Sequence, residues 1–184
     1  MEKVISIGKQ IGKQNFASLR ENHYFFVDKS HFIKDWWENG DEITLITRPR
    51  RFGKTLNMSM LDCFFSNKYA ARGDLFEGLG VWKEEKYREL QGKYPVIFLS
   101  FAAVKADQLS EAKIQIKQQI ARVYEENRYL LDGDLLSGNE KKAYNEVNLH
   151  MGDAEAAAAL NNMSMYLARY YGRRVIILMD EYDT

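Results

Sequence analysis

The sequence predicts an α/β fold, a three-layer sandwich built around a mostly parallel sheet. Three short apolar runs, at residues 42–47, 94–101 and 175–179, lack alternating polar positions, which is typical of strands buried on both faces. The segments between these runs show the three- and four-residue periodicity of amphipathic helices. Strands joined by helices indicate parallel pairing, with helices covering both faces of the sheet.

The first predicted element is a helix in the segment DKSHFIKDWWENG, residues 28–40. Asp28 or Ser30 can cap its start, and Gly40 ends it. Its apolar face comprises Phe32, Ile33, Trp36 and Trp37. We interpret the two tryptophans as packing residues, although a tryptophan placed before a nucleotide loop can also stack on a base.

A strand and a second helix follow. The run EITLIT, residues 42–47, predicts a short buried strand, and Pro49 predicts a turn because proline cannot continue a central strand. Residues 54–67 predict a helix whose apolar side chains recur at three- and four-residue steps. These side chains are Leu56, Met60, Leu61, Phe64 and Phe65, with Cys63 beside them as a core thiol.

The middle of the chain is predicted to be irregular over residues 67–93, before the strand at 94–101. Residues 109–128 then predict an amphipathic helix, and Ser137 with Glu140 predicts a capping box that starts another. The inner stripe of the helix at 109–128 comprises Ala112, Ile116, Ile120 and Val123.

The last helix is predicted from about Asp153 to Tyr171, where Gly172 stops it. Its inner face comprises Leu160, Met163, Leu167 and Tyr170. The final apolar run, at 175–179, leads directly into the two acids Asp180 and Glu181.

Composition narrows the classes of function. The chain has 184 residues, which suits one domain or a piece of a larger one. Lys+Arg and Asp+Glu both number 26, so the zero net charge does not indicate nucleic-acid binding and leaves such contact to local patches. A single cysteine, no signal peptide and no apolar run near the ~20 residues of a membrane helix predict a cytoplasmic protein without a membrane partner.

The stretch LITRPRRFGKTLNMSML, residues 45–61, predicts a phosphate-binding loop between a strand and a helix. Gly53 allows close approach of the backbone to phosphate, Lys54 would reach the β and γ phosphates, and Thr55 would bind Mg²⁺. Arg48 stands where the leading glycine of such loops is usual, so a basic surface turn is the alternative. The residues expected to bind nucleotide are Arg50, Arg51, Phe52, Gly53, Lys54, Thr55 and Leu56.

The end of the chain supports the phosphate loop. Asp180 and Glu181 follow an apolar strand, and in phosphate-loop NTPases such acids hold Mg²⁺ and activate the attacking water. We therefore assign Asp180 and Thr55 to the metal, and Glu181 with Lys54 to catalysis. Both half-motifs lie at the carboxyl ends of predicted parallel strands, where open α/β sheets bind their ligands.

From about residue 5 to its end, the sequence resembles the AAA-ATPase-like proteins of bacteria and archaea. The resemblance is carried by NHYFFVDKSHFIKD, RPRRFGKT, LFEGL, GKYPVIFLSF and VIILMDEYDT. Their loop also lacks the leading glycine, so Arg48 is a feature of that family. The resemblance implies a P-loop NTPase of the AAA-like class with an additional strand, using ATP and Mg²⁺. It assigns no role to the segment YFFVDKS.

Longer members of that family continue beyond the strand that ends in Asp180 and Glu181, and they carry a nuclease-like lobe of the PD-(D/E)XK type. We therefore expect residues 1–184 to form the N-terminal part of one ATPase domain, with an extension at 1–41 and the core at 42–184. The expected function is ATP hydrolysis that drives a switch in a longer protein. The alternatives are a module that binds nucleotide or self-associates without turnover, and a small-molecule kinase, for which the sequence shows no arginine-rich lid.

Overall fold

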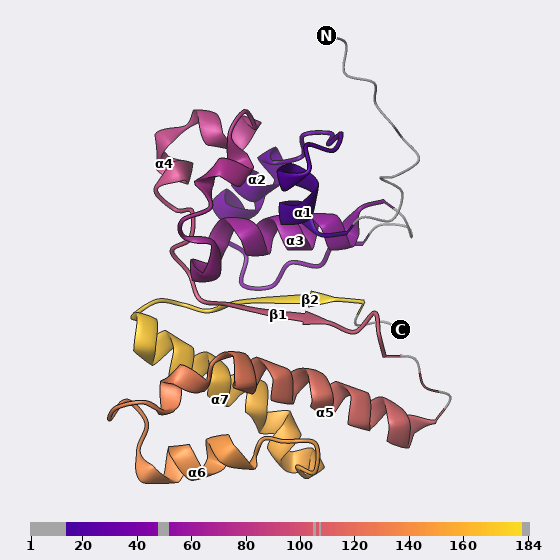
Figure 1. Cartoon of the computed structure of the whole chain (residues 1–184), viewed down its shortest axis with the longest axis vertical. Helices are drawn as coiled ribbons and strands as arrows, with labels where there is room; N and C mark the ends of the chain where they lie inside the picture. The colour runs from indigo at the N-terminus through magenta and orange to yellow at the C-terminus, as the bar shows by residue number, and fades with distance from the viewer. Residues whose placement is uncertain (1–13, 48–51, 105, 107, 182–184) are drawn as a thin grey trace. The chain divides into compact units, whose positions relative to one another are not determined.

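The computed structural model describes residues 14–47, 52–104, 106 and 108–181, and the chain divides into two compact units, Met1–Lys93 and Tyr94–Thr184. Together the described residues form an α/β structure with seven α-helices and one parallel sheet of two strands (Figure 1). No helix within these ranges is both long and apolar enough to cross a bilayer.

The first unit is built from helices. The α-helices are α1 (Phe16–Glu21), α2 (His31–Asn39), α3 (Lys54–Phe65) and α4 (Glu85–Arg88). Short 3-10 helices connect the last two of them: η2 (Asn67–Tyr69), η3 (Gly73–Phe76) and η4 (Gly80–Lys83). The predicted helices at 28–40 and 54–67 and the irregular stretch at 67–93 are therefore confirmed, and Gly40 ends α2 with a left-handed φ of 65°.

Aromatic rings make up much of the core of the first unit. Phe16 stacks on Phe76 at 5.2 Å between ring centroids, and Phe64 meets Phe76 edge-on at 5.1 Å. Trp36 and Trp37 both pack on Phe65, at 5.2 and 5.4 Å. The two tryptophans are thus held in place by α3, which confirms their interpretation as packing residues.

The predicted strand at 42–47 was wrong. None of these residues is in a strand, and Ile43 and Leu45 are 90% and 61% exposed. An apolar, β-branched run becomes a strand only where a neighbour binds its backbone N–H and C=O groups, and no described strand pairs with this one. The segment is instead attached to α2, since Trp36 Nε1 donates to Thr44 Oγ1 at 3.1 Å.

The second unit holds the sheet. Strands β1 (Val96–Ser100) and β2 (Ile176–Asp180) pair in parallel, from Val96 opposite Ile176 to Ser100 opposite Asp180. Helices α5 (Leu109–Glu126), α6 (Gly138–Glu146) and α7 (Asp153–Tyr171) lie on one side of it, with the 3-10 helix η5 (Arg128–Leu131) between the first two (Figure 1).

Local signals for these helices are confirmed. Ser137 Oγ accepts from the Glu140 N–H at 3.3 Å and Glu140 Oε2 accepts from the Ser137 N–H at 2.8 Å, which completes the capping box of α6. Gly172 ends α7 with a left-handed φ of 63°. On α7, however, Tyr170 was predicted to face the core and is 50% exposed, because its ring packs at the surface on Tyr129 and Tyr171.

The core of the second unit joins β1 to the long helices. It contains Ile97, Leu99, Ile120, Val123, Met163 and Leu167. Burial on β2 alternates, with Ile177 and Met179 about two-fifths exposed (42% and 41%), so the prediction of a strand buried on both faces was wrong for β2. On α5 the predicted stripe is buried only in its second half, and Ile116 is 37% exposed.

Candidate functional site

The candidate phosphate site is the N-terminus of α3. Gly53 precedes the helix with a φ of 78°, a left-handed conformation that glycine adopts without strain. Lys54 is the first helical residue, and the first intrahelical bond runs from the Asn57 N–H to the Gly53 carbonyl at 2.9 Å. Helix geometry leaves the N–H groups before Asn57 without an intrahelical acceptor.

Within the part of the chain that the structure describes, no side-chain cap bond is found at the start of α3, and its first turn has no acidic residue. The start of α6 is different, because Ser137 and Glu140 occupy its amides with their own oxygens. The start of α3 therefore presents amide donors and the positive end of a helix dipole, a combination that binds anions.

The described loop residues surround this N-terminus. Phe52 is 58% exposed, while Gly53, Lys54, Thr55 and Leu56 are half-buried. Arg50 and Arg51, predicted to bind nucleotide, lie outside the described residues, as do Arg48 and Pro49.

Lys29 is a neighbour of Gly53 that the sequence did not indicate. Its Nζ lies 3.9 Å from the position that a Cβ would occupy on Gly53. The segment YFFVDKS has no motif that brings it to a phosphate loop, and the two residues are separated along the chain by all of α2. Only the folded first unit shows that the Lys29 ammonium lies beside the glycine of the loop.

Asp180 and Glu181 lie at the carboxyl end of β2. Asp180 is 4% exposed, and its Oδ2 has no hydrogen-bond partner among the described residues. Its backbone carbonyl accepts from the Phe101 N–H at 2.9 Å, which anchors the strand end to the chain after β1. Glu181 has a φ of 55°, a left-handed conformation that is uncommon outside glycine and is often found at functional positions.

Comparison with known proteins assigns the chain to a family. The profile of a family described as predicted AAA-ATPase matches residues 10–184. The chain belongs to this AAA-ATPase-like family. A protein of Azotobacter chroococcum mcd 1, described as an uncharacterized protein in the vnfD 5' region, is 30% identical over 176 residues. That match covers 94% of this chain and 28% of the relative, so the chain spans less than a third of the relative's length. No solved structure matches the chain.

The donor set of this AAA-ATPase-like chain is suited to Mg²⁺. In the described ranges, no group of three or more His, Cys, Asp or Glu side chains could hold a metal by itself. Mg²⁺ at nucleotide sites needs no such group, because one or two protein oxygens, phosphate oxygens and water complete its shell. The unpartnered, buried Oδ2 of Asp180 is an oxygen of this kind.

The predicted site residues belong to both units of the AAA-ATPase-like chain. Lys54 and Thr55 lie in Met1–Lys93, and Asp180 and Glu181 lie in Tyr94–Thr184. We propose below that these four residues act on one nucleotide.

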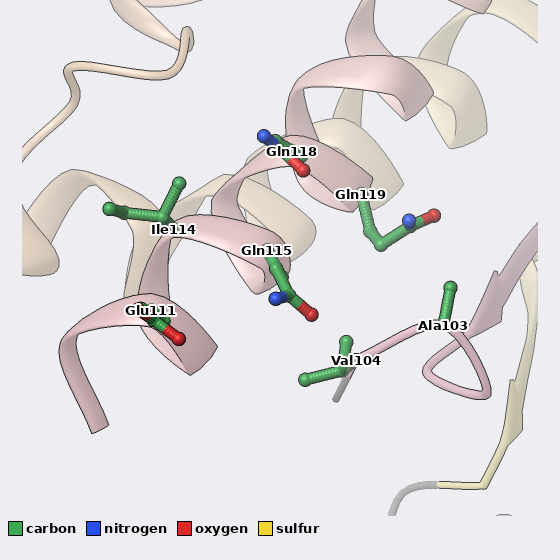
Figure 2. Close-up of a pocket in the computed structure, with 7 residues that line it drawn as sticks. All are labelled: Ala103, Val104, Glu111, Ile114, Gln115, Gln118 and Gln119. Carbon is green, nitrogen blue, oxygen red and sulfur yellow. The ribbon is translucent and has the colours of Figure 1, made fainter. Parts of the chain in front are cut away.

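A separate pocket of about 380 Å³ lies between α5 and the chain after β1 (Figure 2). Its lining comprises Ala103, Val104, Glu111, Ile114, Gln115, Gln118 and Gln119. Among the described residues of that lining, Glu111 is the one charged side chain, and its charge repels phosphate.

Proposed function

We propose that this AAA-ATPase-like chain is the nucleotide-binding part of a P-loop NTPase of the additional-strand class, which binds ATP with Mg²⁺ and hydrolyses it. The observation that carries the proposal is the N-terminus of α3, which no described side chain caps, which follows a left-handed Gly53 and which begins with Lys54. The family match over residues 10–184 supports the same reading of the sequence.

The phosphates bind at the first turn of α3. The backbone N–H groups of Gly53, Lys54, Thr55 and Leu56 donate to phosphate oxygens, and the Lys54 ammonium balances their charge. The backbone can approach the phosphates closely at Gly53 because no Cβ stands in the way. Arg50, Arg51 and Phe52 complete the loop, and the two arginines attract the polyphosphate as it approaches.

The Thr55 hydroxyl and the Asp180 carboxylate hold the metal. When bound, Mg²⁺ neutralises the charge that develops on the transferred phosphate. This role accounts for a buried carboxylate whose Oδ2 has no donor among the described residues. Such a carboxylate costs stability unless a cation binds it.

Glu181 acts as the general base. Its carboxylate orients a water molecule for attack on the γ phosphate and accepts the proton from that water. The left-handed backbone at Glu181 turns the chain directly after Asp180, so that consecutive acids serve different roles.

In the whole protein, hydrolysis drives a conformational switch coupled to a further region, for which a nuclease-like lobe or a second copy of the chain is the expected partner. We place the protein in the cytoplasm, with residues 42–184 as the core and 1–41 as its extension.

The proposal is tested by measuring ATP binding to the chain by calorimetry, with and without Mg²⁺. Lys54→Ala should weaken binding about a hundredfold, because it removes the ammonium that faces the β and γ phosphates. Lys83→Ala is the matched control, since Lys83 is an exposed lysine of the same unit. Equal affinities of the parent and Lys54→Ala would overturn the assignment.

Turnover is tested separately by phosphate release. Glu181→Gln should retain ATP binding and lose hydrolysis, because an amide cannot accept the proton of the attacking water. If the parent binds ATP and releases no phosphate, the chain is a nucleotide-binding module. Release that requires a small-molecule acceptor would indicate a kinase instead.

A further inference from the structure

We propose that Lys29 is a second phosphate-binding lysine, which reaches the loop from the chain ahead of α2 and neutralises the nucleotide's phosphates together with Lys54. This inference rests on the proposed function and deepens it, since it adds a binding residue from outside the loop motif. Its basis is the position of the Lys29 Nζ, 3.9 Å from the point where Gly53 would carry a Cβ.

The backbone at Lys29 is held by the residues on both sides of it. Asp28 Oδ2 accepts from the Gly80 N–H at 2.7 Å, and Ser30 Oγ accepts from the Val81 N–H at 3.0 Å. Asp28 Oδ1 also accepts from the Ser30 N–H at 2.8 Å, which closes the turn around Lys29. Because Asp28 and Ser30 are both bonded to the start of η4, Lys29 is fixed between them.

Among the described residues, the adjacent carboxylate of Asp28 bonds to backbone amides and not to the Lys29 ammonium. Burial raises the pKa of Asp28, but the hydrogen bonds from Ser30 and Gly80 outweigh it and lower that pKa below its usual value. Both oxygens of the charged carboxylate are thus engaged with backbone amides. Among the described residues, no hydrogen bond or ion pair involves the Lys29 ammonium, so its charge is available to an anion.

The location of this charge matches the loop's chemistry. The first amides of α3 and the side of Gly53 that lacks a Cβ are where a phosphate would approach. An ammonium within contact distance of that side adds a charge-assisted hydrogen bond to a phosphate oxygen. Such bonds contribute more than neutral ones, and the loss of one corresponds to about a tenfold change in affinity.

The test uses the whole chain and two probes, ATP and inorganic tripolyphosphate, with binding measured by calorimetry at several salt concentrations. Lys29→Ala should weaken binding of both probes about tenfold and reduce the salt dependence of binding. Lys29→Arg should retain most of the affinity, because it keeps the charge. Lys83→Ala should bind like the parent, and circular dichroism with thermal unfolding should show that every variant folds.

The outcomes separate this inference from the proposed function. If Lys54→Ala loses both probes and Lys29→Ala keeps parental affinity, Lys29 has no phosphate role while the proposed function stands. If the parent binds tripolyphosphate through Lys29 but does not bind ATP, the proposed function fails, and the role of Lys29 is overturned for a nucleotide and limited to inorganic polyphosphate. A parent that binds neither probe overturns both.

Discussion

Ser100 and Asp180 are register partners at the carboxyl ends of the two parallel strands. Because paired residues of neighbouring parallel strands project to the same face, the hydroxyl and the carboxylate leave the sheet on one side. Asp180 is buried and its Oδ2 has no hydrogen-bond partner among the described residues. This strand end therefore carries two side chains with oxygen atoms, and one of these oxygens, Asp180 Oδ2, is an acceptor that a cation can bind.

The first prediction concerns that carboxylate. Asp180→Asn should leave the free energy of unfolding without ligand unchanged or raise it by about 1 kcal/mol, because it removes a buried charge. The same variant should lose the additional thermal stabilisation that Mg²⁺ gives in the presence of ATP. Thermal unfolding with ATP, with and without Mg²⁺, measures both effects. Asp134→Asn, an exposed change in the same unit, should behave like the parent, and a full Mg²⁺ effect in Asp180→Asn would contradict the metal role.

A stability prediction concerns Gly92. Its φ is 69°, and an added Cβ would lie 2.3 Å from the Ala70 Cα, a backbone atom that cannot rotate away. The Gly92 N–H also donates to the Phe64 carbonyl at 2.8 Å, which holds the position against α3. Gly92→Ala should therefore lower the free energy of unfolding by about 3 kcal/mol or more in urea denaturation.

Gly40→Ala is the control for Gly92→Ala. Gly40 has a similar φ of 65°, but an added Cβ there would have no heavy atom within 4 Å. Its cost should be only the conformational one, about 1 kcal/mol. Equal losses in the two variants would show that the contact with Ala70 does not determine the effect.

A pH dependence should arise from Glu140 and Arg169. The Arg169 guanidinium donates to both oxygens of Glu140, at 2.9 and 3.2 Å, and with the Ser137 N–H it lowers the pKa of this carboxyl to about 2. A lowered pKa in the folded state means that the stabilisation is complete above the ordinary value of 4.5 and is lost as the pH falls toward 2.

This pH dependence is measured as the difference in thermal midpoint between the parent and Glu140→Gln. We expect a higher midpoint for the parent at pH 7 and a difference that shrinks between about pH 4.5 and pH 2. Glu146→Gln, in the same helix and exposed, is the control. A difference that stays constant over this range would rule out the ion pair as its cause.

The last prediction concerns the reactivity of Cys63. The side chain is fully buried (0% exposed), and burial together with the nearby charge of Asp62 raises the pKa of its thiol to about 12. Labelling with a thiol reagent at pH 8 should be at least about a hundredfold slower in the folded chain than in urea, because only a thiolate in an opened state reacts. An exposed thiol introduced by Lys83→Cys should react at once, and equally fast labelling of Cys63 would contradict its burial.

Local sequence signals predicted the longer helices, while the short helices α1 and α4 were not predicted. The capping box of Ser137 and Glu140 predicted the start of α6, and Gly40 and Gly172 predicted the ends of α2 and α7. These signals work because a helix satisfies its backbone hydrogen bonds within one segment, so that neighbouring residues decide where it begins and ends. The candidate loop residues Gly53, Lys54 and Thr55 were predicted from the local GKT motif, and the structure places them at the start of α3.

Only the tertiary structure decided which apolar runs became strands and which distant residues met. The run at 42–47 contains β-branched residues that favour a strand, but a strand depends on a partner for its backbone groups, and its sequence carries no information about that partner. Lys29 lies beside Gly53 because Asp28 and Ser30 bond to Gly80 and Val81, about fifty residues away along the chain. Such contacts depend on how the whole unit packs, so no local pattern could have predicted them.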